Sequence, residues 1–199
     1  MEYANSLNNL GNCYQNLGDY DKALRYYSDA SVIYRDNLGE NSIQVAGTLN
    51  NIGNCYEELG DFGKAIEALS QAKEIYREIL GEQHAYYSGS LINLGRCYGA
   101  LGDRQTAIRY YTEAADLDRA TLGEKHPQYA ISLESIANNY FYLGEYDKAL
   151  AYYEDVLTIY GESLGEQHPY YANTLNGIGL CYSTGLVAPQ YVGSSQTKD

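Results

Sequence analysis

Four cysteines and three histidines are the side chains of this 199-residue sequence that could ligate a metal ion or carry redox chemistry. Metal ligation needs several donors that converge on one point. Here the donors recur singly, at Cys13, Cys55, Cys97 and Cys181 and at His84, His126 and His168. Equivalent cysteines in neighbouring packed helices would be about 10 Å apart, whereas a disulfide needs Cα atoms within about 7 Å. We therefore predict that the cysteines are buried packing residues, that the histidines have loop or capping roles, and that no metal is bound.

Catalytic motifs are missing from the rest of the sequence. There is no Ser/His/Asp arrangement, no glycine-rich phosphate loop and no His-Glu-x-x-His, and no two cysteines form a Cys-x-x-Cys pair. The many Asp and Glu residues are scattered along helical patterns, where solvated surface is their ordinary role. We predict a protein that is not an enzyme and that carries no cofactor.

The spacing of the cysteines and histidines reflects an internal repeat of 42 residues. Tyrosines follow it without a gap, at Tyr14, Tyr56, Tyr98, Tyr140 and Tyr182. The tripeptide Leu17-Gly18-Asp19 recurs in the next two units and, with Glu in place of Asp, in the fourth. No residue is inserted or deleted across four units, so the sequence predicts a repeat architecture.

Each unit contains two helical patterns. In the first unit, apolar residues at three- and four-residue spacing predict a helix over roughly residues 2–17, which Gly18 ends. Asp19 is placed to cap a second helix, whose pattern runs from Tyr20 to Leu38 and stops at Gly39. Before later first helices, Pro127 and Pro169 stand at the first helical turn, where the missing N–H costs nothing.

These residues resemble the tetratricopeptide repeat signature. The matching residues of the first unit are Leu7, Leu10, Gly11, Tyr14, Ala23 and Tyr27. The resemblance implies an all-α fold, a right-handed superhelical solenoid of antiparallel helix pairs with four full repeats and one extra helix. Where the common unit has proline, this sequence has Arg35, Arg77, Arg119 and Gly161, so the second helix is expected to continue and to lengthen the unit. Close approach within the hairpins is expected at Gly11, Gly53, Gly95, Ala137 and Gly179, and the columns of tyrosine are expected to fill the hairpin core.

The long unit and the Leu-Gly-Glu-x-His-Pro linkers are similar to those of the kinesin light chain and nephrocystin group. We expect an array over residues 1–183, with repeats at about 1–41, 42–84, 85–126 and 127–168 and a partial repeat at 169–183. Residues 184–199 lack helical periodicity and are expected to form a flexible tail. Solenoids need polar caps, and neither end has an obvious one. The sequence is therefore interpreted as part of a longer array, and self-association through the uncapped ends is one further hypothesis.

Asparagine is the polar residue that stands out in the first helices. It is a mediocre helix former, yet it recurs on one stripe at Asn5, Asn8, Asn9, Asn12, Asn50, Asn51, Asn54, Asn93, Asn138, Asn173 and Asn176. The resemblance implies that first helices line the concave groove in which such arrays bind peptides. An asparagine amide is both donor and acceptor, which suits the backbone of an extended peptide. The alternative is a solvated polar face.

The resemblance also limits the class of peptide. Chaperone-binding relatives clamp a carboxylate with Lys and Arg, but the corresponding residues here are Asn8, Asn12, Asn51, Gly89 and Asn93. Kinesin light chains favour acidic cargo and supply basic groove residues, of which this groove has essentially Arg96. Glu57 and Glu58 would instead favour a basic peptide. We include Glu57, Glu58 and Arg96 in the predicted peptide-binding site.

Composition supports a protein partner. The formal net charge is −13, which disfavours nucleic acid and anionic membranes. No apolar stretch approaches the ~20 residues of a membrane span, and the first residues do not resemble a signal peptide, so we expect a cytoplasmic protein. The leading hypothesis is a scaffold or adaptor that binds a partner peptide in the groove. The alternative is the regulatory or sensor arm of a larger signalling enzyme or NTPase, which the flanking sequence would distinguish.

Overall fold

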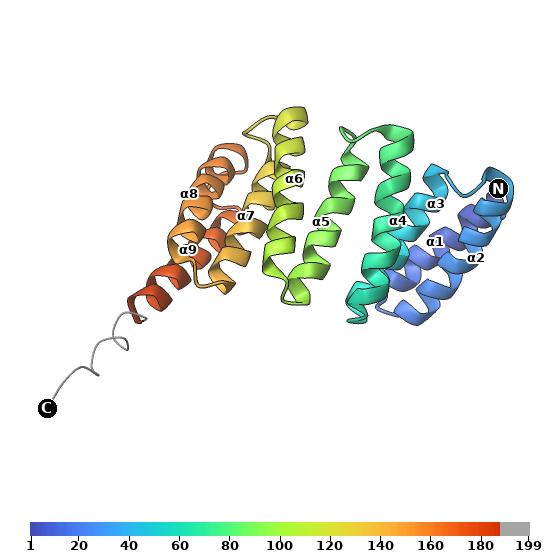
Figure 1. Cartoon of the computed structure of the whole chain (residues 1–199), viewed down its shortest axis with the longest axis horizontal. Coiled ribbons are helices and arrows are strands. Elements are labelled where there is room, and N and C mark those ends of the chain that lie inside the picture. The colour runs from blue at the N-terminus through green and yellow to red at the C-terminus, as the bar shows by residue number, and fades with distance from the viewer. Residues whose placement is uncertain (188–199) are drawn as a thin grey trace, which may run out of the picture. The chain divides into compact units, whose positions relative to one another are not determined.

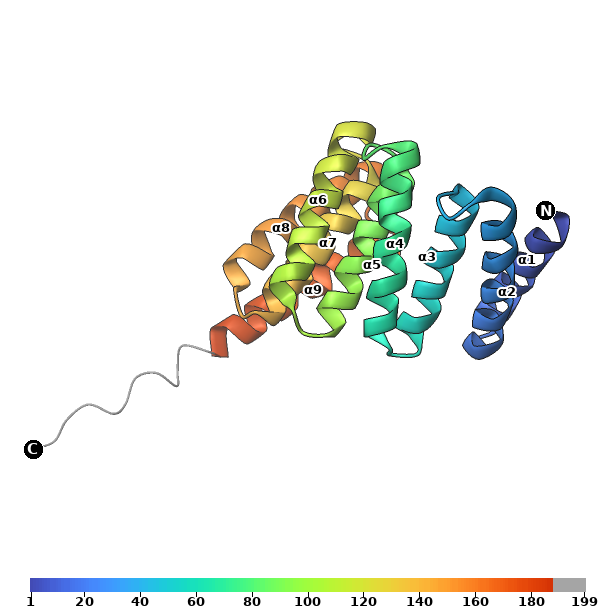
Figure 2. The same cartoon turned by 45° about the vertical axis from the view of Figure 1, so that its right-hand side comes forward.

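The computed structural model describes residues 1–187, and every regular element among these residues is an α-helix. The helices form two compact units, Met1–Leu117 and the residues from Asp118 onward, and the boundary falls inside α6. Each unit is built from helical hairpins whose successive helices run antiparallel (Figures 1 and 2). The all-α prediction is confirmed, with four two-helix repeats and one further helix.

The first unit contains five complete helices and most of a sixth. These are α1 (Glu2–Asn16), α2 (Tyr20–Leu38), α3 (Ile43–Glu58), α4 (Phe62–Leu80), α5 (Ala85–Ala100) and α6 (Arg104–Leu122). The second helices of 19 residues continue through Arg35 and Arg77. This confirms that the 42-residue unit is long because its second helix is long.

The second unit contains α7 (Pro127–Tyr142), α8 (Tyr146–Ser163) and α9 (Pro169–Val187). Helix α9 continues four residues past the end expected at 183, because Gly185-Leu186-Val187 replaces the Leu-Gly-Asp that turns the chain in earlier repeats. The rest of the expected tail, residues 188–199, lies outside the described residues.

The turns follow from two glycines and one acidic residue per repeat. Gly18 and Gly39 have φ of 75° and 84°, a region in which a side chain would be strained. The Asp19 carboxylate accepts the backbone N–H of Lys22 at 3.2 Å and so caps α2. The imidazole of His84 accepts the N–H of Tyr86 at 3.2 Å at the start of α5. His126 and His168 do the same for α7 and α9, which confirms the capping role.

Within each hairpin, a glycine of the first helix contacts a bulky side chain of the second. A Cβ on Gly11 would lie 2.5 Å from Cε1 of Tyr27, and one on Gly53 would lie 2.6 Å from Cγ of Leu69. Gly95 meets Tyr111 in the same way, at 2.9 Å. Predicted close approach is therefore confirmed in the first three hairpins.

The tyrosine columns form much of the core. Tyr27 and Tyr160 are fully buried, and the equivalent Tyr111, Tyr153, Tyr34 and Tyr76 are nearly so. Partly exposed rings stack in pairs between the two helices of a hairpin, for example Tyr14 of α1 on Tyr26 of α2 with centroids 5.3 Å apart. Burial raises the pKa of the Cys55 thiol to about 11, so this cysteine is an unreactive packing residue as predicted.

Two predictions fail in the terminal helices. Cys13 is exposed, whereas Cys55, Cys97 and Cys181 are buried, because no described helix precedes α1 to cover it. No described residue comes within 4 Å of a Cβ built on Gly179, because no described helix follows α9 to pack against it. Tyr3 of α1 and Tyr182 of α9 are exposed as well. Self-association through the ends of the array stays a prediction.

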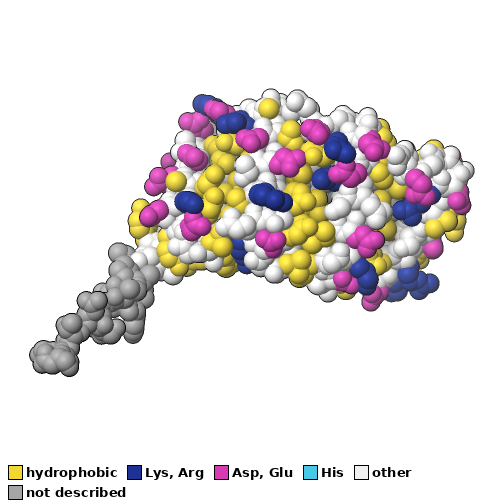
Figure 3. All heavy atoms as spheres, in the orientation of Figure 1, with side chains coloured by type: hydrophobic (Ala, Val, Ile, Leu, Met, Phe, Trp, Pro, Cys, Tyr) yellow, Lys and Arg dark blue, Asp and Glu magenta, His cyan; other side chains and the backbone are white. Residues whose placement is uncertain are grey.

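The surface mixes both signs of charge. On the face that Figure 3 shows, basic side chains lie among acidic ones and form no continuous basic patch. No helix within residues 1–187 is both long and apolar enough to cross a membrane. The same residues contain no cluster of three or more Cys, His, Asp or Glu side chains that could hold a metal ion.

Two glycine substitutions test the hairpin contact. We expect Gly53→Ala to destabilise the protein by about 1–3 kcal/mol, because Leu69 and the Ala65 carbonyl leave no room for the methyl group. Gly89→Ala serves as the control in α5, where no described atom lies within 4 Å of the added Cβ. It should stabilise the helix by about 0.5–1 kcal/mol. Urea unfolding followed by circular dichroism measures both, and shifts of the same sign would contradict this explanation.

Candidate peptide-binding site

The predicted asparagines of the first unit lie on the first helices α1, α3 and α5. Asn5 and Asn9 are exposed, while the others in this unit are half-buried between neighbouring helices. The register explains the arrangement, since positions 8 and 50, and positions 9, 51 and 93, are equivalent in successive repeats. The stripe is therefore partly a packed surface and partly an open one.

Three of these asparagines line one pocket of about 350 Å³ in the first unit. The lining residues come from five consecutive helices. They are Asn8, Tyr34, Gln44, Gly47, Thr48, Asn50, Asn51, Tyr76 and Tyr86. The pocket thus combines amide groups with three tyrosine rings, and its size is in the range of small ligand sites.

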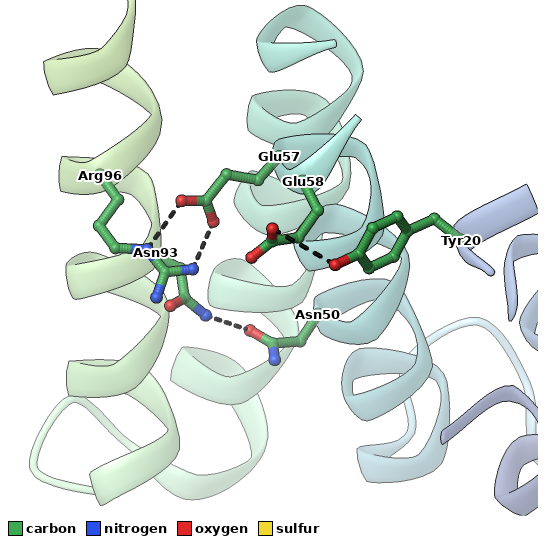
Figure 4. A network of polar contacts seen from close by, with 6 residues as sticks. All are labelled: Tyr20, Asn50, Glu57, Glu58, Asn93 and Arg96. Carbon is green, nitrogen blue, oxygen red and sulfur yellow. Dashed lines mark hydrogen bonds and ion pairs between the residues drawn. The ribbon is translucent and has the colours of Figure 1, made fainter. Parts of the chain in front are cut away.

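Hydrogen bonds between asparagines link the first helices across repeats. Asn93 Nδ2 donates to Asn50 Oδ1 at 3.0 Å, which joins α5 to α3 (Figure 4). Asn51 Nδ2 donates to Asn12 Oδ1 at 3.4 Å, which joins α3 to α1. These two contacts form a ladder that runs across three repeats, and they fix the orientation of the amide groups that remain on the surface.

Buried tyrosines hold further members of the stripe from below. The hydroxyl of Tyr34 donates to Asn5 Oδ1 at 2.7 Å, and that of Tyr153 donates to Asn138 Oδ1 at 2.6 Å. Tyr27 lies 2.7 Å from the side-chain oxygen of Asn12. Burial raises the pKa of Tyr76 to about 12 and that of the other core tyrosines as well, so these hydroxyls keep their protons and act as donors at neutral pH.

The predicted charged residues pair within the protein. Arg96 makes a bidentate ion pair with Glu57, and its Nε lies 2.8 Å from Glu57 Oε1 (Figure 4). Glu58 is exposed and accepts a hydrogen bond of 3.4 Å from the hydroxyl of Tyr20. Arg96 therefore compensates Glu57, and Glu58 is the better placed of the two for a basic partner group.

The second unit carries a different version of the stripe. Asn173 and Asn176 are exposed on α9. Neither side chain forms a hydrogen bond with another described residue. Glu134 stands where Asn8 and Asn50 stand in the first two repeats. It accepts hydrogen bonds of 3.3 Å from Thr174 and Tyr160. Burial raises the pKa of the Glu134 carboxyl, and these two bonds lower it by less.

The sequence-based site omitted the aromatic and small residues of the pocket. Tyr34 and Tyr76 were assigned to the core alone, although both also line the pocket. One signal could have located it. Gly47 and Gly89 interrupt the middle of two helices without a packing neighbour close enough to require glycine, at a cost in helix propensity of about 1 kcal/mol each.

The sequence profile of the tetratricopeptide repeat matches residues 2–78, 44–120, 87–162 and 130–185. The chain belongs to the tetratricopeptide repeat family. No curated protein matches the chain. Among solved structures, this tetratricopeptide repeat protein is similar to the kinesin light chain TPR-like repeats from Podosopora anserina, with 22% identity and a TM-score of 0.81 over 94% of this chain and 90% of that one.

Two further structures are similar to this tetratricopeptide repeat protein. BtubC (BKLC) from P. vanneervenii has 23% identity and a TM-score of 0.79, over 88% of this chain and 70% of that one. The apo form of RapI has 16% identity and a TM-score of 0.82, over 94% of this chain and 65% of that one. At such identities the likeness establishes the fold alone, a tetratricopeptide solenoid.

The ion pair between Glu57 and Arg96 can be measured by a double-mutant cycle. We expect Glu57→Gln and Arg96→Met to be coupled by about 1 kcal/mol, because the bidentate contact is partly exposed to solvent. Urea unfolding of the two single variants and the double variant gives this coupling, which should shrink in 1 M salt. Additive effects would show that the pair does not stabilise α3 against α5.

Glu134→Gln should change how stability depends on pH. Since burial raises the folded-state pKa of Glu134, the folded protein binds this proton more tightly than the unfolded chain does. Its contribution to stability is therefore lost as the pH rises through the folded-state pKa. We expect the variant to melt at a higher temperature than the wild type at pH 7. This difference in melting temperature should disappear as the pH falls toward 4. Glu154→Gln, at an exposed position of α8, is the control and should show no such trend.

Proposed function

We propose that this protein is a non-catalytic scaffold or adaptor that binds an extended segment of a partner protein along the first helices of its repeats. The supporting observation is the ladder of asparagine contacts that joins α1, α3 and α5 beside a pocket. A chain of amide groups at regular intervals suits a ligand that also repeats at regular intervals. An extended polypeptide is such a ligand.

The dimensions agree with a short peptide. Packed helices are about 10 Å apart, so three first helices separated by second helices present a surface on the order of 20 Å or more across. An extended chain rises about 3.3 Å per residue, and six or more residues would cover this surface. In the proposed complex, the peptide is bound by the amide groups of Asn5, Asn8, Asn9, Asn12, Asn50, Asn51, Asn54 and Asn93 in the first unit and by those of Asn138, Asn173 and Asn176 in the second unit.

Charge adds a preference for the partner. Glu58 is exposed, and the protein as a whole has a formal net charge of −13, so a segment with Lys or Arg near Glu58 is attracted in the encounter. Glu57 contributes less, because Arg96 neutralises it. Arg96 itself keeps donors free for a peptide carbonyl group.

The proposal is tested with peptides selected from a random display library against the whole chain. The triple substitution Asn50→Ala, Asn51→Ala, Asn54→Ala should weaken the binding of selected peptides about tenfold or more, because each lost hydrogen bond contributes roughly 0.5–1.5 kcal/mol. Fluorescence anisotropy measures the affinity. Circular dichroism should show native helicity, because none of the three is fully buried.

A double variant controls for the loss of asparagine as such. Asn37→Ala, Asn41→Ala removes two exposed asparagines that lie outside the first helices. It should leave peptide affinity unchanged. If the ladder variant keeps its affinity while its helicity is native, the assignment of binding to the first helices is wrong.

A further inference from the structure

The pocket that Asn8, Asn50 and Asn51 line has no charged lining residue. Its walls are amides, hydroxyls, a glycine and tyrosine rings, although the protein carries 26 acidic and 13 basic residues. A charged group that enters such a pocket loses hydration without gaining an ion pair, which is costly. The pocket is therefore suited to an uncharged group that can form hydrogen bonds.

Two neighbouring asparagines in the lining present opposite halves of their amide groups. Asn50 uses its Oδ1 to accept the hydrogen bond from Asn93, and its Nδ2 is turned away from that contact (Figure 4). Asn51 uses its Nδ2 to donate to Asn12, and its Oδ1 makes no hydrogen bond to another described residue. The pair therefore offers a donor from Asn50 and an acceptor from Asn51, each fixed by a bond to a different helix.

A carboxamide matches this pair, because its acceptor and its donor are on two separate atoms. Its carbonyl oxygen accepts from Asn50 Nδ2, and its amino group donates to Asn51 Oδ1. A carboxylate has no donor and an ammonium has no acceptor, so each would leave one member of the pair unsatisfied. The rings of Tyr76 and Tyr86, with centroids 5.2 Å apart, provide an apolar wall for the methylene groups of the ligand.

Gly47 keeps this pocket open. It lies in the interior of α3, where a Cβ would find its nearest described neighbour, the Tyr76 hydroxyl, at an ordinary 3.6 Å. Packing therefore does not require glycine here, in contrast with Gly53 in the same helix. The equivalent residue of the fourth repeat is Ile131, which shows that a large side chain is compatible with a first helix at this register.

We propose that this pocket binds a side-chain carboxamide, from an Asn or Gln of the partner segment, between Asn50 and Asn51. The inference rests on the proposed function and adds to it a residue preference at one position of the peptide. The side chain is the source of the amide, because a pocket lined by Tyr34, Tyr76 and Tyr86 receives a group that projects from the peptide, whereas the peptide backbone runs along the exposed part of the stripe.

The test uses small probes and the whole chain, and does not need a known partner. Propionamide stands for the glutamine side chain, n-butylamine for lysine, propionate for glutamate and N-methylacetamide for the peptide backbone. Side-chain amide resonances of Asn8, Asn50 and Asn51 are followed by nuclear magnetic resonance during titration. We expect saturable shifts with propionamide in the millimolar range, and at least tenfold weaker responses with the two charged probes.

Gly47→Ile supplies the matched variant. It should abolish the response to propionamide by filling the pocket, while Gly89→Ile, the same change one repeat later and outside the pocket lining, should leave the response intact. Both variants should keep the helicity of the wild type. A response to propionamide that survives Gly47→Ile would overturn the pocket assignment.

The remaining outcomes are also decisive. Equal shifts with propionamide and propionate, or no shift with propionamide, would overturn the carboxamide preference. A response to N-methylacetamide alone would show that the site binds backbone and would overturn the side-chain assignment. Each of these results leaves the peptide-display test untouched. Conversely, a saturable propionamide response together with a failed peptide selection would reject the proposed function and retain the carboxamide pocket.

Discussion

The contact between a glycine of the first helix and a bulky residue of the second determines more than the packing of one hairpin. Gly11 lets the ring of Tyr27 lie against the backbone of α1, and from that position the Tyr27 hydroxyl reaches Asn12. The same relation between core and surface recurs in the fourth repeat, where Tyr153 donates to Asn138. In the second repeat the bulky residue is Leu69, which has no hydroxyl, and the buried oxygen of Asn54 has no hydrogen-bond partner among the described residues. Whether the buried residue is tyrosine or leucine thus decides whether the asparagine above it receives a hydrogen bond from the core.

A strict repeat favours recognition over catalysis for a geometric reason. Each column places one residue of a kind per repeat, so equivalent side chains are separated by a repeat width and cannot converge on one atom. The histidines illustrate this, since each caps its own helix. The same separation is an advantage toward a polymer, whose groups are also spaced along a line. Where asparagine amides do meet, at Asn12 with Asn51 and at Asn50 with Asn93, the contact joins different columns of neighbouring repeats.

Much of the fold could be predicted from the sequence because the 42-residue repeat places equivalent residues at the same position of each unit. A role assigned to a residue in one repeat can therefore be checked against its equivalents in the others. Helix ends, the capping by Asp19 and His126, and the close approach at Gly53 all follow from columns of equivalent residues. The failures at Cys13 and Gly179 occur in the first and last helices, whose environment differs although their sequence pattern does not.

The candidate site was less predictable, since its polar contacts depend on side-chain orientations between repeats. The stripe of asparagines followed from helical spacing, but the partner of each amide did not. Arg96 and Glu57 are 39 residues apart and belong to different columns, so no periodicity relates them. The pocket itself depends on what is missing at Gly47, and a missing side chain gives only a weak signal in a helical pattern.

Departures from the repeat are therefore the places where one repeat can bind differently from the next. The column of Asn8 reads Asn, Asn, Ile, Glu and Asn along the chain, and the column of Asn5 reads Asn, Gly, Gly, Ile and Asn. Gly47 leaves space for the pocket beside Asn50. At the equivalent positions of α7, Ile131 has a large side chain and Glu134 has an acidic one. Because the core columns stay nearly constant, such substitutions alter the surface without altering the helices beneath it. The proposed preference for an uncharged amide in the first unit thus comes from changes at a few surface columns on a scaffold that the repeat holds fixed.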